Sequence, residues 1–326
     1  MDSEKKLYPM RFCSIEDKYS WGSETFNAAD LGYKDSLVRE GWLAGNSFAE
    51  IMDTYMDRIS GDYTYELFGR QFPICIRTIN VSGKMPLRAH PDDTIGLERY
   101  DCLGKEKLWY ILKAEQNAKL LLGWNTDTNA SEMLSAFEDE QSLEAMLNTI
   151  HPQVGEVYRI KPGTVHGASG EIKIVEISQA SPLDFCMHSW GEVVSEEEFD
   201  SSLKIIDALD FIDYKAYNND IQPQGEEGNI VSLLKIPAFE VKKIVLDGAL
   251  RINNGDEGDF SLYYCLNGEV SINTEEYSTT IKGQDAALVP SECAEYIIAS
   301  NNSRSEVLEI SLPRIGKKDS YLNQNE

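Results

Sequence analysis

The chain has 326 residues, more than one domain usually holds, which predicts two domains that each bury a core of their own. A content of 42% hydrophobic and 10% aromatic residues excludes a disordered chain. The 55 acidic residues outnumber the 30 basic ones and give a net charge of -25, which repels phosphate backbones and anionic bilayers. We therefore expect neither a nucleic-acid partner nor a membrane partner.

Targeting signals and cysteine motifs are not evident. Residues 1–14 contain no apolar run long enough for a signal peptide, and no later window holds about eighteen uncharged apolar residues. We therefore expect a cytoplasmic protein. Without a Cys-x-x-Cys pair, the cysteines are expected to be buried or half-buried thiols rather than disulfide or metal-binding residues. They are Cys13, Cys75, Cys102, Cys186, Cys265 and Cys293.

The first two thirds of the chain mix strands with a few helices. Ser47-x-x-Glu50 forms a capping box ahead of a segment with helical spacing, which predicts a helix. β-branched residues with a period of two predict a strand from Phe72 to Val81. Two short amphipathic helices are expected between 128 and 150, as an insertion into a β fold. Further strands are expected at 87–90, 105–112, 117–124, 156–161 and 171–178.

The polar stretch 217–229 predicts a linker between an N-terminal domain at 1–216 and a smaller C-terminal domain at 230–326. In the C-terminal domain, Asn267-Gly268 predicts a β-hairpin, because it supplies the positive φ of a type I′ turn. The segment Gly283–Pro290 predicts a turn followed by a buried strand. Evenly spaced short strands in both domains predict an all-β fold of two jelly-roll barrels, the first with a helical insertion and flanking helices.

Three segments of the N-terminal domain carry the side chains best suited to chemistry. If they are neighbouring strands of one barrel, they bring two imidazoles and three charged side chains close to one cavity. These residues are Arg88, His90, Glu106, Lys107 and His166. Taken alone, His90 before a proline is more typical of a turn, and Arg88 and Lys107 are typical of a surface. Because Arg88 and His90 are two residues apart on a strand, they share a face, which favours a common cavity.

The order of these motifs resembles the type I mannose-6-phosphate isomerases over roughly residues 15 to 215. The resemblance implies a double-cupin fold and a zinc-dependent aldose–ketose isomerase of carbohydrate metabolism, which interconverts mannose 6-phosphate and fructose 6-phosphate. The C-terminal barrel resembles the smaller cupin of that family only in kind. The matching motifs are His90-Pro91-Asp92-Asp93, then Gly104-Lys105-x-x-Leu108-Trp109-Tyr110-Ile111, then Pro162-Gly163-Thr164-Val165-His166.

In that family zinc is held by a Gln two residues before the first histidine, by that histidine, by a Glu of the Gly-Lys-x-Glu segment, and by the histidine of the Gly-Thr-x-His turn. The resemblance thus implies His90 and His166 as metal ligands. The Gln position holds Arg88, and the Glu position holds Lys107. The family's Arg after its Gln-x-Ser strand falls on Cys186, while the Gln-x-Ser itself survives as Gln179-Ala180-Ser181.

The two cations change the chemistry expected of the site. Zinc in proteins takes about four N, S or O donors. A unit charge about 4 Å from a dication, at an effective dielectric of about 20, is worth roughly 8 kcal/mol, so Lys in place of Glu turns an attraction into a repulsion of similar size. Two imidazoles alone are not expected to hold zinc tightly. A strand slip that brings in Glu106, a third nitrogen from His188, or a deprotonated Lys107 acting as a base would each compensate.

Two functional hypotheses stand beside a purely structural role. The first is an active phosphosugar isomerase. The second is a metal-free descendant that binds a sugar phosphate or another small anion, with the two cations supplying the positive charge of the lost zinc. We expect His90 and His166 at any metal, Lys107 as the catalytic residue, and Arg88 and Gln179 as substrate-binding residues. The sequence carries no signal for a particular oligomeric state.

Overall fold

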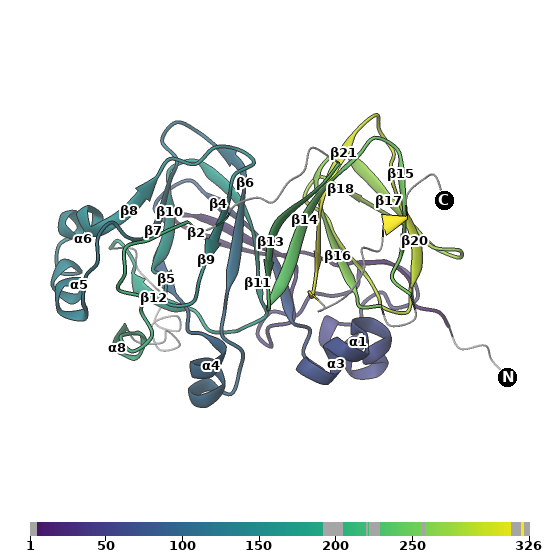
Figure 1. The fold of residues 1–326 in the computed structure, drawn as a ribbon, viewed down its shortest axis with the longest axis horizontal. Coiled ribbons are helices and arrows are strands. Elements are labelled where there is room, and N and C mark those ends of the chain that lie inside the picture. The colour runs from purple at the N-terminus through teal and green to yellow at the C-terminus, as the bar shows by residue number, and fades with distance from the viewer. Residues whose placement is uncertain are drawn as a thin grey trace. The chain divides into compact units, whose positions relative to one another are not determined.

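The computed structural model describes residues 5–191, 205–219, 221, 229–255, 258–313 and 321–322. Its strands form four sheets that build two β-barrels (Figure 1). The chain divides into two compact units by its internal contacts. We call residues 16–25 and 77–221 the N-terminal barrel unit, and residues 1–15, 26–76 and 222–326 the C-terminal barrel unit. The predicted all-β fold with two jelly-roll barrels is confirmed.

The first barrel consists of two sheets that enclose an apolar core. One sheet has the strand order β2-β3-β4-β11-β6-β9, and the other has the order β12-β5-β10-β7-β8. The strands of the first sheet are β2 (Ile15–Tyr19), β3 (Gly22–Ala28), β4 (Ile74–Val81), β6 (Lys107–Ala114), β9 (Val157–Ile160) and β11 (Ile172–Gln179). Those of the second are β5 (Leu87–Ala89), β7 (Lys119–Trp124), β8 (Leu147–Ile150), β10 (His166–Ser169) and β12 (Phe185–His188).

The inward-facing side chains of this barrel change from apolar to polar along each strand. Successive side chains of a strand point to opposite faces, so every second residue points inward. The core includes Ile79 of β4, Trp109 of β6 and Ile174 of β11. In each of these inward-facing rows, the side chain two residues away from the named core residue is charged and buried. These side chains are Arg77, Lys107 and Glu176. The barrel therefore holds a layer of buried charges next to its apolar core.

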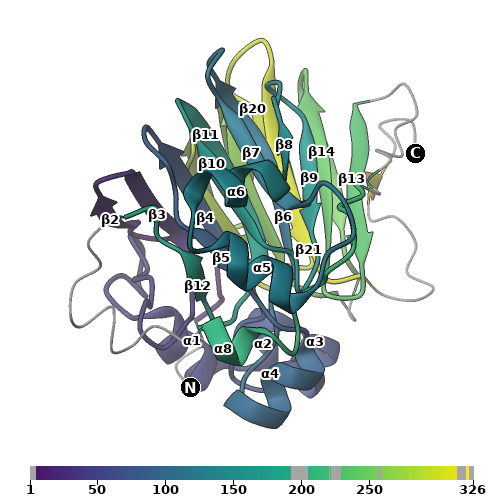
Figure 2. The ribbon, with the colours of Figure 1, turned by 90° about the vertical axis from the view of Figure 1, so that its left-hand side faces the viewer.

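Helices cover the outer face of the sheet β12-β5-β10-β7-β8 (Figure 2). They are α5 (Ala130–Ala136), α6 (Glu140–Met146) and α8 (Ile205–Ala208), and α4 (Asp93–Tyr100) follows β5. Met133 of α5 and Leu143 of α6 pack with Leu121 of β7 in one apolar cluster. The predicted helical insertion at 128–150 is thus observed as α5 and α6, with its last four residues forming β8.

The second barrel again has two sheets, ordered β1-β19-β16-β21-β14-β13 and β18-β17-β20-β15-β22. The strands of the first are β1 (Met10–Arg11), β13 (Ile230–Ile236), β14 (Phe239–Leu246), β16 (Ser261–Asn267), β19 (Ala286–Val289) and β21 (Ser305–Ser311). Those of the second are β15 (Ala249–Asn253), β17 (Glu269–Asn273), β18 (Ser278–Lys282), β20 (Glu295–Ser300) and β22 (Tyr321–Leu322). The strand predicted before Pro290 is β19, and all four of its residues are buried.

The predicted hairpin at Asn267-Gly268 is wrong. The strand before it, β16, pairs with β19 and β21, whereas the strand after it, β17, pairs with β18 and β20 in the other sheet. The dipeptide therefore carries the chain from one sheet of the barrel to the other. Gly268 has a φ of 82°, and a Cβ there would lie 2.4 Å from Ser305 Oγ, so the corner requires glycine.

The division into units differs from the predicted contiguous domains at residues 1–15 and 26–76, which group with the C-terminal barrel. Its boundary at 221/222 lies within the predicted 217–229 linker, of which 220 and 222–228 lie outside the described residues. Residues 26–76 instead group with the C-terminal barrel, because they pack there: Ser291 N donates to the Ile59 carbonyl at 2.9 Å, and the rings of Phe72 and Phe260 lie 4.5 Å apart. This segment carries α1 (Phe48–Tyr55), with the predicted capping box at Ser47, α2 (Asp57–Ser60) and α3 (Asp62–Phe68).

Five of the six cysteines are buried or half-buried, as expected. Cys75, Cys265 and Cys293 are buried, Cys102 and Cys186 are half-buried, and all are free thiols. Cys13, also a free thiol, is exposed, contrary to the expectation of burial. None of the described helices is long and apolar enough to cross a membrane.

Candidate functional site

The predicted site residues meet inside the first barrel because three strands converge there. Strands β10 and β5 pair with His166 opposite Arg88, and β6 brings Lys107 from the facing sheet. The rings of His90 and His166 lie 5.1 Å apart between centroids, at an angle of 44°. His90, Lys107 and His166 are all buried. The structure therefore brings the two imidazoles and Lys107 together, as their order in the sequence predicted.

Lys107 lies at the centre of this cluster. Its side chain is 0% exposed, and its Nζ is 3.1 Å from His166 Nε2 and 3.3 Å from Glu176 Oε2. Burial lowers the pKa of Lys107 to about 7, although the Glu176 carboxylate acts to raise it. The amine is thus close to half-protonated at neutral pH and donates hydrogen bonds to both partners.

Both imidazoles are held in one tautomer by backbone carbonyls. His166 Nδ1 lies 2.8 Å from the Thr164 oxygen, and His90 Nδ1 lies 2.9 Å from the Leu183 oxygen. Because a carbonyl only accepts, each Nδ1 carries the hydrogen and each Nε2 has a lone pair. Burial and the neighbouring Lys107 lower the pKa of His166 to about 3 and hold that of His90 well below its usual range. Both rings are therefore neutral.

The two Nε2 atoms differ in their partners. His166 Nε2 accepts from Lys107. His90 Nε2 is buried and has no hydrogen-bond partner among the described residues. A buried acceptor without a donor is rare and indicates a place where a donor, a water or a cation would be accommodated.

A continuous network of ion pairs extends from Lys107 towards the solvent. Glu176, which binds Lys107, accepts from Arg77 at 2.6 Å, and Arg77 also donates to Glu24 at 3.0 Å. Glu24 in turn accepts from Arg88 at 2.7 Å, and Arg88 lies 3.1 Å from Asp184. The side chains of Arg77, Glu24 and Glu176 are at most 5% exposed, whereas those of Arg88 and Asp184 are 11% and 28% exposed. The network therefore reaches the surface at Arg88 and Asp184.

The charges of this network stabilise one another. Burial alone would raise the pKa of the Glu176 carboxyl, but Arg77 and Lys107 hold it well below its usual range. In the same way Arg88 outweighs burial and lowers the pKa of Asp184. Lys105 is also buried, and its Nζ donates to the Leu183 carbonyl at 3.4 Å. With Lys107 protonated, the four cations Arg77, Arg88, Lys105 and Lys107 exceed the three carboxylates Glu24, Glu176 and Asp184 by one positive charge.

These residues do not fit a zinc ion in their present arrangement. Zinc needs lone pairs directed at one point, and that of His166 Nε2 is taken by the Lys107 amine. Within the described part of the chain, no group of three His, Cys, Asp or Glu side chains could hold a metal ion. The site is instead organised around an amine that belongs to the chain itself.

The other residues considered from the sequence lie away from this centre. The Gln179 amide accepts from Glu106 N at 2.9 Å and donates to Asp93 at 3.0 Å, so it joins two backbone segments. The Glu106 carboxylate pairs with Arg159 at 2.5 Å on the opposite side of its strand from Lys107, so the strand has not slipped and the expectation that Glu106 faces the cavity is wrong. His188 packs against Trp190, with 4.6 Å between ring centroids, and supplies no third nitrogen.

The residues that sequence reasoning missed are the carboxylates and the second arginine. Arg77 and Glu176 are each the one charged residue in a largely apolar inward row of their strand, and this signal could have identified them. Glu24 lies in a mixed polar strand and gave no such signal. Asp184 follows β11 in a short loop, where an acidic residue is common.

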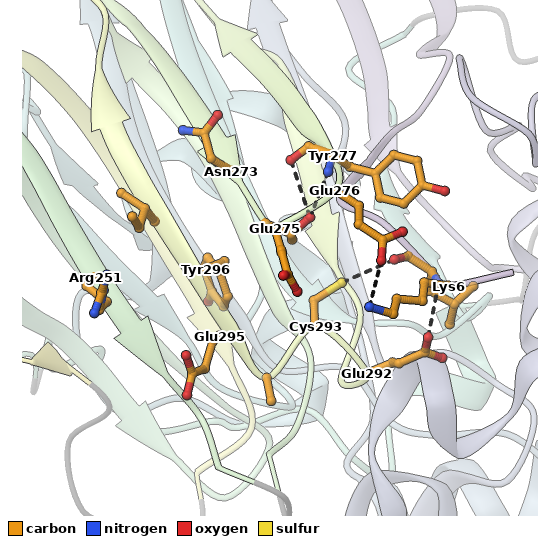
Figure 3. A pocket seen from close by; sticks show the side chains of 14 residues that line it. Lys6, Arg251, Asn273, Glu275, Glu276, Tyr277, Glu292, Cys293, Glu295 and Tyr296 are labelled. Carbon is orange, nitrogen blue, oxygen red and sulfur yellow. Dashed lines mark hydrogen bonds and ion pairs between the residues drawn. The ribbon is translucent and has the colours of Figure 1, made fainter.

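A separate pocket of about 670 Å³ lies in the C-terminal barrel unit (Figure 3). Its lining is acidic and partly paired, since Lys6 Nζ lies 2.7 Å from Glu276 and Glu292 accepts from Leu7 N at 3.1 Å. Burial raises the pKa of the Cys293 thiol beside it to about 12. The pocket contains none of the site residues predicted from the sequence.

Comparison with known proteins adds relatives at low identity, while no family model matches the chain. The mannose-6-phosphate isomerase ManA of Bacillus subtilis is 21% identical over 312 residues, covering 88% of this chain and 95% of that protein. A mannose-6-phosphate isomerase of Streptococcus mutans is 22% identical over 221 residues, covering 65% of this chain and 68% of that protein.

The solved structures that match have the same fold. The mannose 6-phosphate isomerase from Bacillus subtilis superposes with a TM-score of 0.78 at 18% identity, over 94% of this chain and 100% of the other. A putative mannosephosphate isomerase from Archaeoglobus fulgidus gives 0.72 at 17% identity, over 95% and 100%. The sequence relatives and solved structures named here are thus mannose-6-phosphate isomerases or putative ones by name, and this chain shares the fold of those structures.

Proposed function

We propose that this protein is a metal-free member of the mannose-6-phosphate isomerase family that binds a phosphosugar, or a similar small anion, in the first barrel. The observation that carries the proposal is the hydrogen bond between the Lys107 amine and His166 Nε2, which occupies a lone pair that zinc would need. Zinc-dependent isomerisation is accordingly not part of the proposed function. A cytoplasmic location belongs to the proposal, because the free thiols suit a reducing compartment.

The class of ligand follows from charge and from the relatives. Relatives in the family are named for an isomerase of mannose 6-phosphate, a dianionic sugar. The ion-pair network opens to solvent at Arg88 and Asp184, and Lys105 is a further buried cation near it. A phosphate group that displaced Asp184 from the Arg88 guanidinium would gain a charge-assisted, bidentate contact. Arg88 is therefore the proposed anion-binding residue, and Gln179 stays a prediction as a second one.

The experiment is a thermal-shift titration combined with metal analysis. Mannose 6-phosphate is expected to stabilise the zinc-free protein by RT ln(1 + [L]/Kd), about 2.7 kcal/mol at a hundredfold excess over Kd. Unphosphorylated mannose at the same concentration is expected to give no shift. The matched variant Arg88→Gln, which keeps the strand but loses the cation, is expected to lose the response. Equal shifts with mannose and mannose 6-phosphate would contradict the proposal.

A second candidate function is metal-independent isomerisation with Lys107 as the base. The observation that favours it is the pKa of Lys107, which burial lowers to about 7. Aldose–ketose exchange moves a proton between adjacent carbons, and a base with a pKa near the working pH does this most effectively. An assay of mannose 6-phosphate conversion in the presence of a chelator decides between the two. Turnover that Lys107→Met abolishes supports the candidate, and absence of turnover leaves the binding function.

A further inference from the structure

The surroundings of the two imidazoles are those of metal-binding histidines. Metal-ligating histidines donate one ring N–H to a carbonyl or carboxylate, which directs the other nitrogen at the ion. His90 and His166 do this through the carbonyls of Leu183 and Thr164. The carbonyl contacts that orient metal-binding histidines are therefore present, although the Lys107 amine occupies the lone pair of His166 Nε2.

Glu176 completes this arrangement with a carboxylate. Its Oε2 accepts from Trp109 Nε1 at 2.7 Å, and its Oε1 accepts from Arg77 at 2.6 Å, so the carboxylate is fixed in orientation. The same Oε2 lies 3.3 Å from Lys107 Nζ, and His166 Nε2 lies 3.1 Å from that nitrogen. The position of Lys107 Nζ is thus defined by one imidazole and one carboxylate.

Distances show what a metal ion would require here. Zinc binds imidazole nitrogen and carboxylate oxygen at about 2.0 to 2.2 Å. An ion at the position of Lys107 Nζ would therefore need both His166 and Glu176 to move inwards by about 1 Å. The ring of His90 lies 5.1 Å from that of His166 between centroids, and its Nε2 has no hydrogen-bond partner among the described residues, so it is the candidate third donor. The lysine keeps these groups too far apart to hold an ion as they stand.

We propose that the Lys107 ammonium is a tethered replacement for a divalent cation, and that it fills a latent metal site formed by His166, Glu176 and His90. The inference shares with the proposed function the premise of a metal-free barrel. It goes further because it assigns Glu176 as a latent metal ligand and Lys107 as the group that blocks the site. Arg88 need not change for the site to open, since its guanidinium is engaged by Glu24 and Asp184.

The test compares two substitutions at one position. Lys107→Ala removes the amine and its stem, which leaves room for an ion and a water. Lys107→Met removes the amine but fills the space. Binding of Co²⁺ is followed by calorimetry and by its visible absorption bands, which report the coordination geometry independently of any activity. Lys107→Ala is expected to bind one Co²⁺ at least about a hundredfold more tightly than Lys107→Met or the unmutated protein.

Further variants locate the ion and keep the test decisive. In the Lys107→Ala background, His166→Ala and Glu176→Gln are each expected to weaken Co²⁺ binding and change the absorption bands. If Lys107→Ala is unfolded when purified, Co²⁺ is expected to restore its circular dichroism, because binding energy becomes folding energy. Equal binding by the alanine and methionine variants, binding insensitive to His166→Ala, or failure of Co²⁺ to refold the variant would each overturn the inference. Phosphosugar binding by the unmutated protein does not depend on this result.

Discussion

Replacing Lys107 with methionine removes a buried amine and keeps most of the side-chain volume. Burial lowers the pKa of Lys107 from 10.5 to about 7. Between about pH 7 and pH 10 the unfolded chain therefore holds a proton that the folded barrel has released, so the free energy of unfolding of the unmutated protein rises with pH. The slope reaches about 1.4 kcal/mol per pH unit, or roughly 4 kcal/mol over the interval. Below about pH 7 both states hold the proton, and the contribution is constant.

The groups around Lys107 do not obscure this effect. The pKa of His166 is lowered to about 3, and the pKa values of Glu176 and Asp184 lie below their usual ranges, so all three keep their charge state above neutral pH. Arg77, which shares Glu176, stays protonated throughout. The slope between pH 7 and pH 10 therefore reports the Lys107 amine.

Urea unfolding at a series of pH values, followed by tryptophan fluorescence, measures the effect. The difference in unfolding free energy, unmutated protein minus Lys107→Met, is expected to rise by a few kcal/mol from pH 7 to pH 10 and to be flat below pH 7. The matched control is Lys113→Met on the same strand, where the side chain is 64% exposed and no such slope is expected. A difference that stays level or falls above pH 7 would refute the reasoning.

The remaining predictions concern the metal, the network and the fold. Lys107→Glu is expected to take up zinc more tightly than Lys107→Ala in metal analysis, because a carboxylate plus a divalent ion carries the same net charge as the lysine; equal uptake would contradict this. Arg77→Met leaves two buried carboxylates without their shared cation and is expected to cost about 3 to 5 kcal/mol in urea unfolding. Lys6→Ala, at an exposed ion pair, is expected to leave the unfolding free energy nearly unchanged. Gly268→Ala is expected to lower the melting temperature, because the left-handed φ and the contact with Ser305 both oppose a Cβ. The control Gly283→Ala, which has open space around its Cβ, is expected to leave the melting temperature unchanged.

The order of the motifs was sufficient to predict that His90, Lys107 and His166 lie close together. Lys107 and His166 begin strands β6 and β10, and His90 directly follows β5. They meet because a jelly roll brings such strands together. Their partners were not predictable in the same way. The contact of Lys107 with Glu176 depends on which strands of a sheet are neighbours, and sequence spacing within one strand does not determine that.

The wrong hairpin prediction and the unexpected grouping of residues 26–76 have a common physical origin in long-range packing. Asn267-Gly268 has the local chemistry of a hairpin, yet the strands on either side pair with distant partners in different sheets. The helix after Ser47 was placed correctly, but its grouping with the C-terminal barrel follows from contacts such as that of Phe72 with Phe260. Local preference determined these elements, whereas tertiary contacts determined what they join.

The central claim is that the Lys107 amine takes the place of a metal ion in the first barrel. The most direct test is the zinc content of the unmutated protein after incubation with excess zinc and dialysis against buffer without chelator. The account predicts much less than one zinc per chain, and a content that His166→Ala leaves unchanged. One zinc per chain that is lost on His166→Ala would show that the barrel is a working metal centre and would contradict the account.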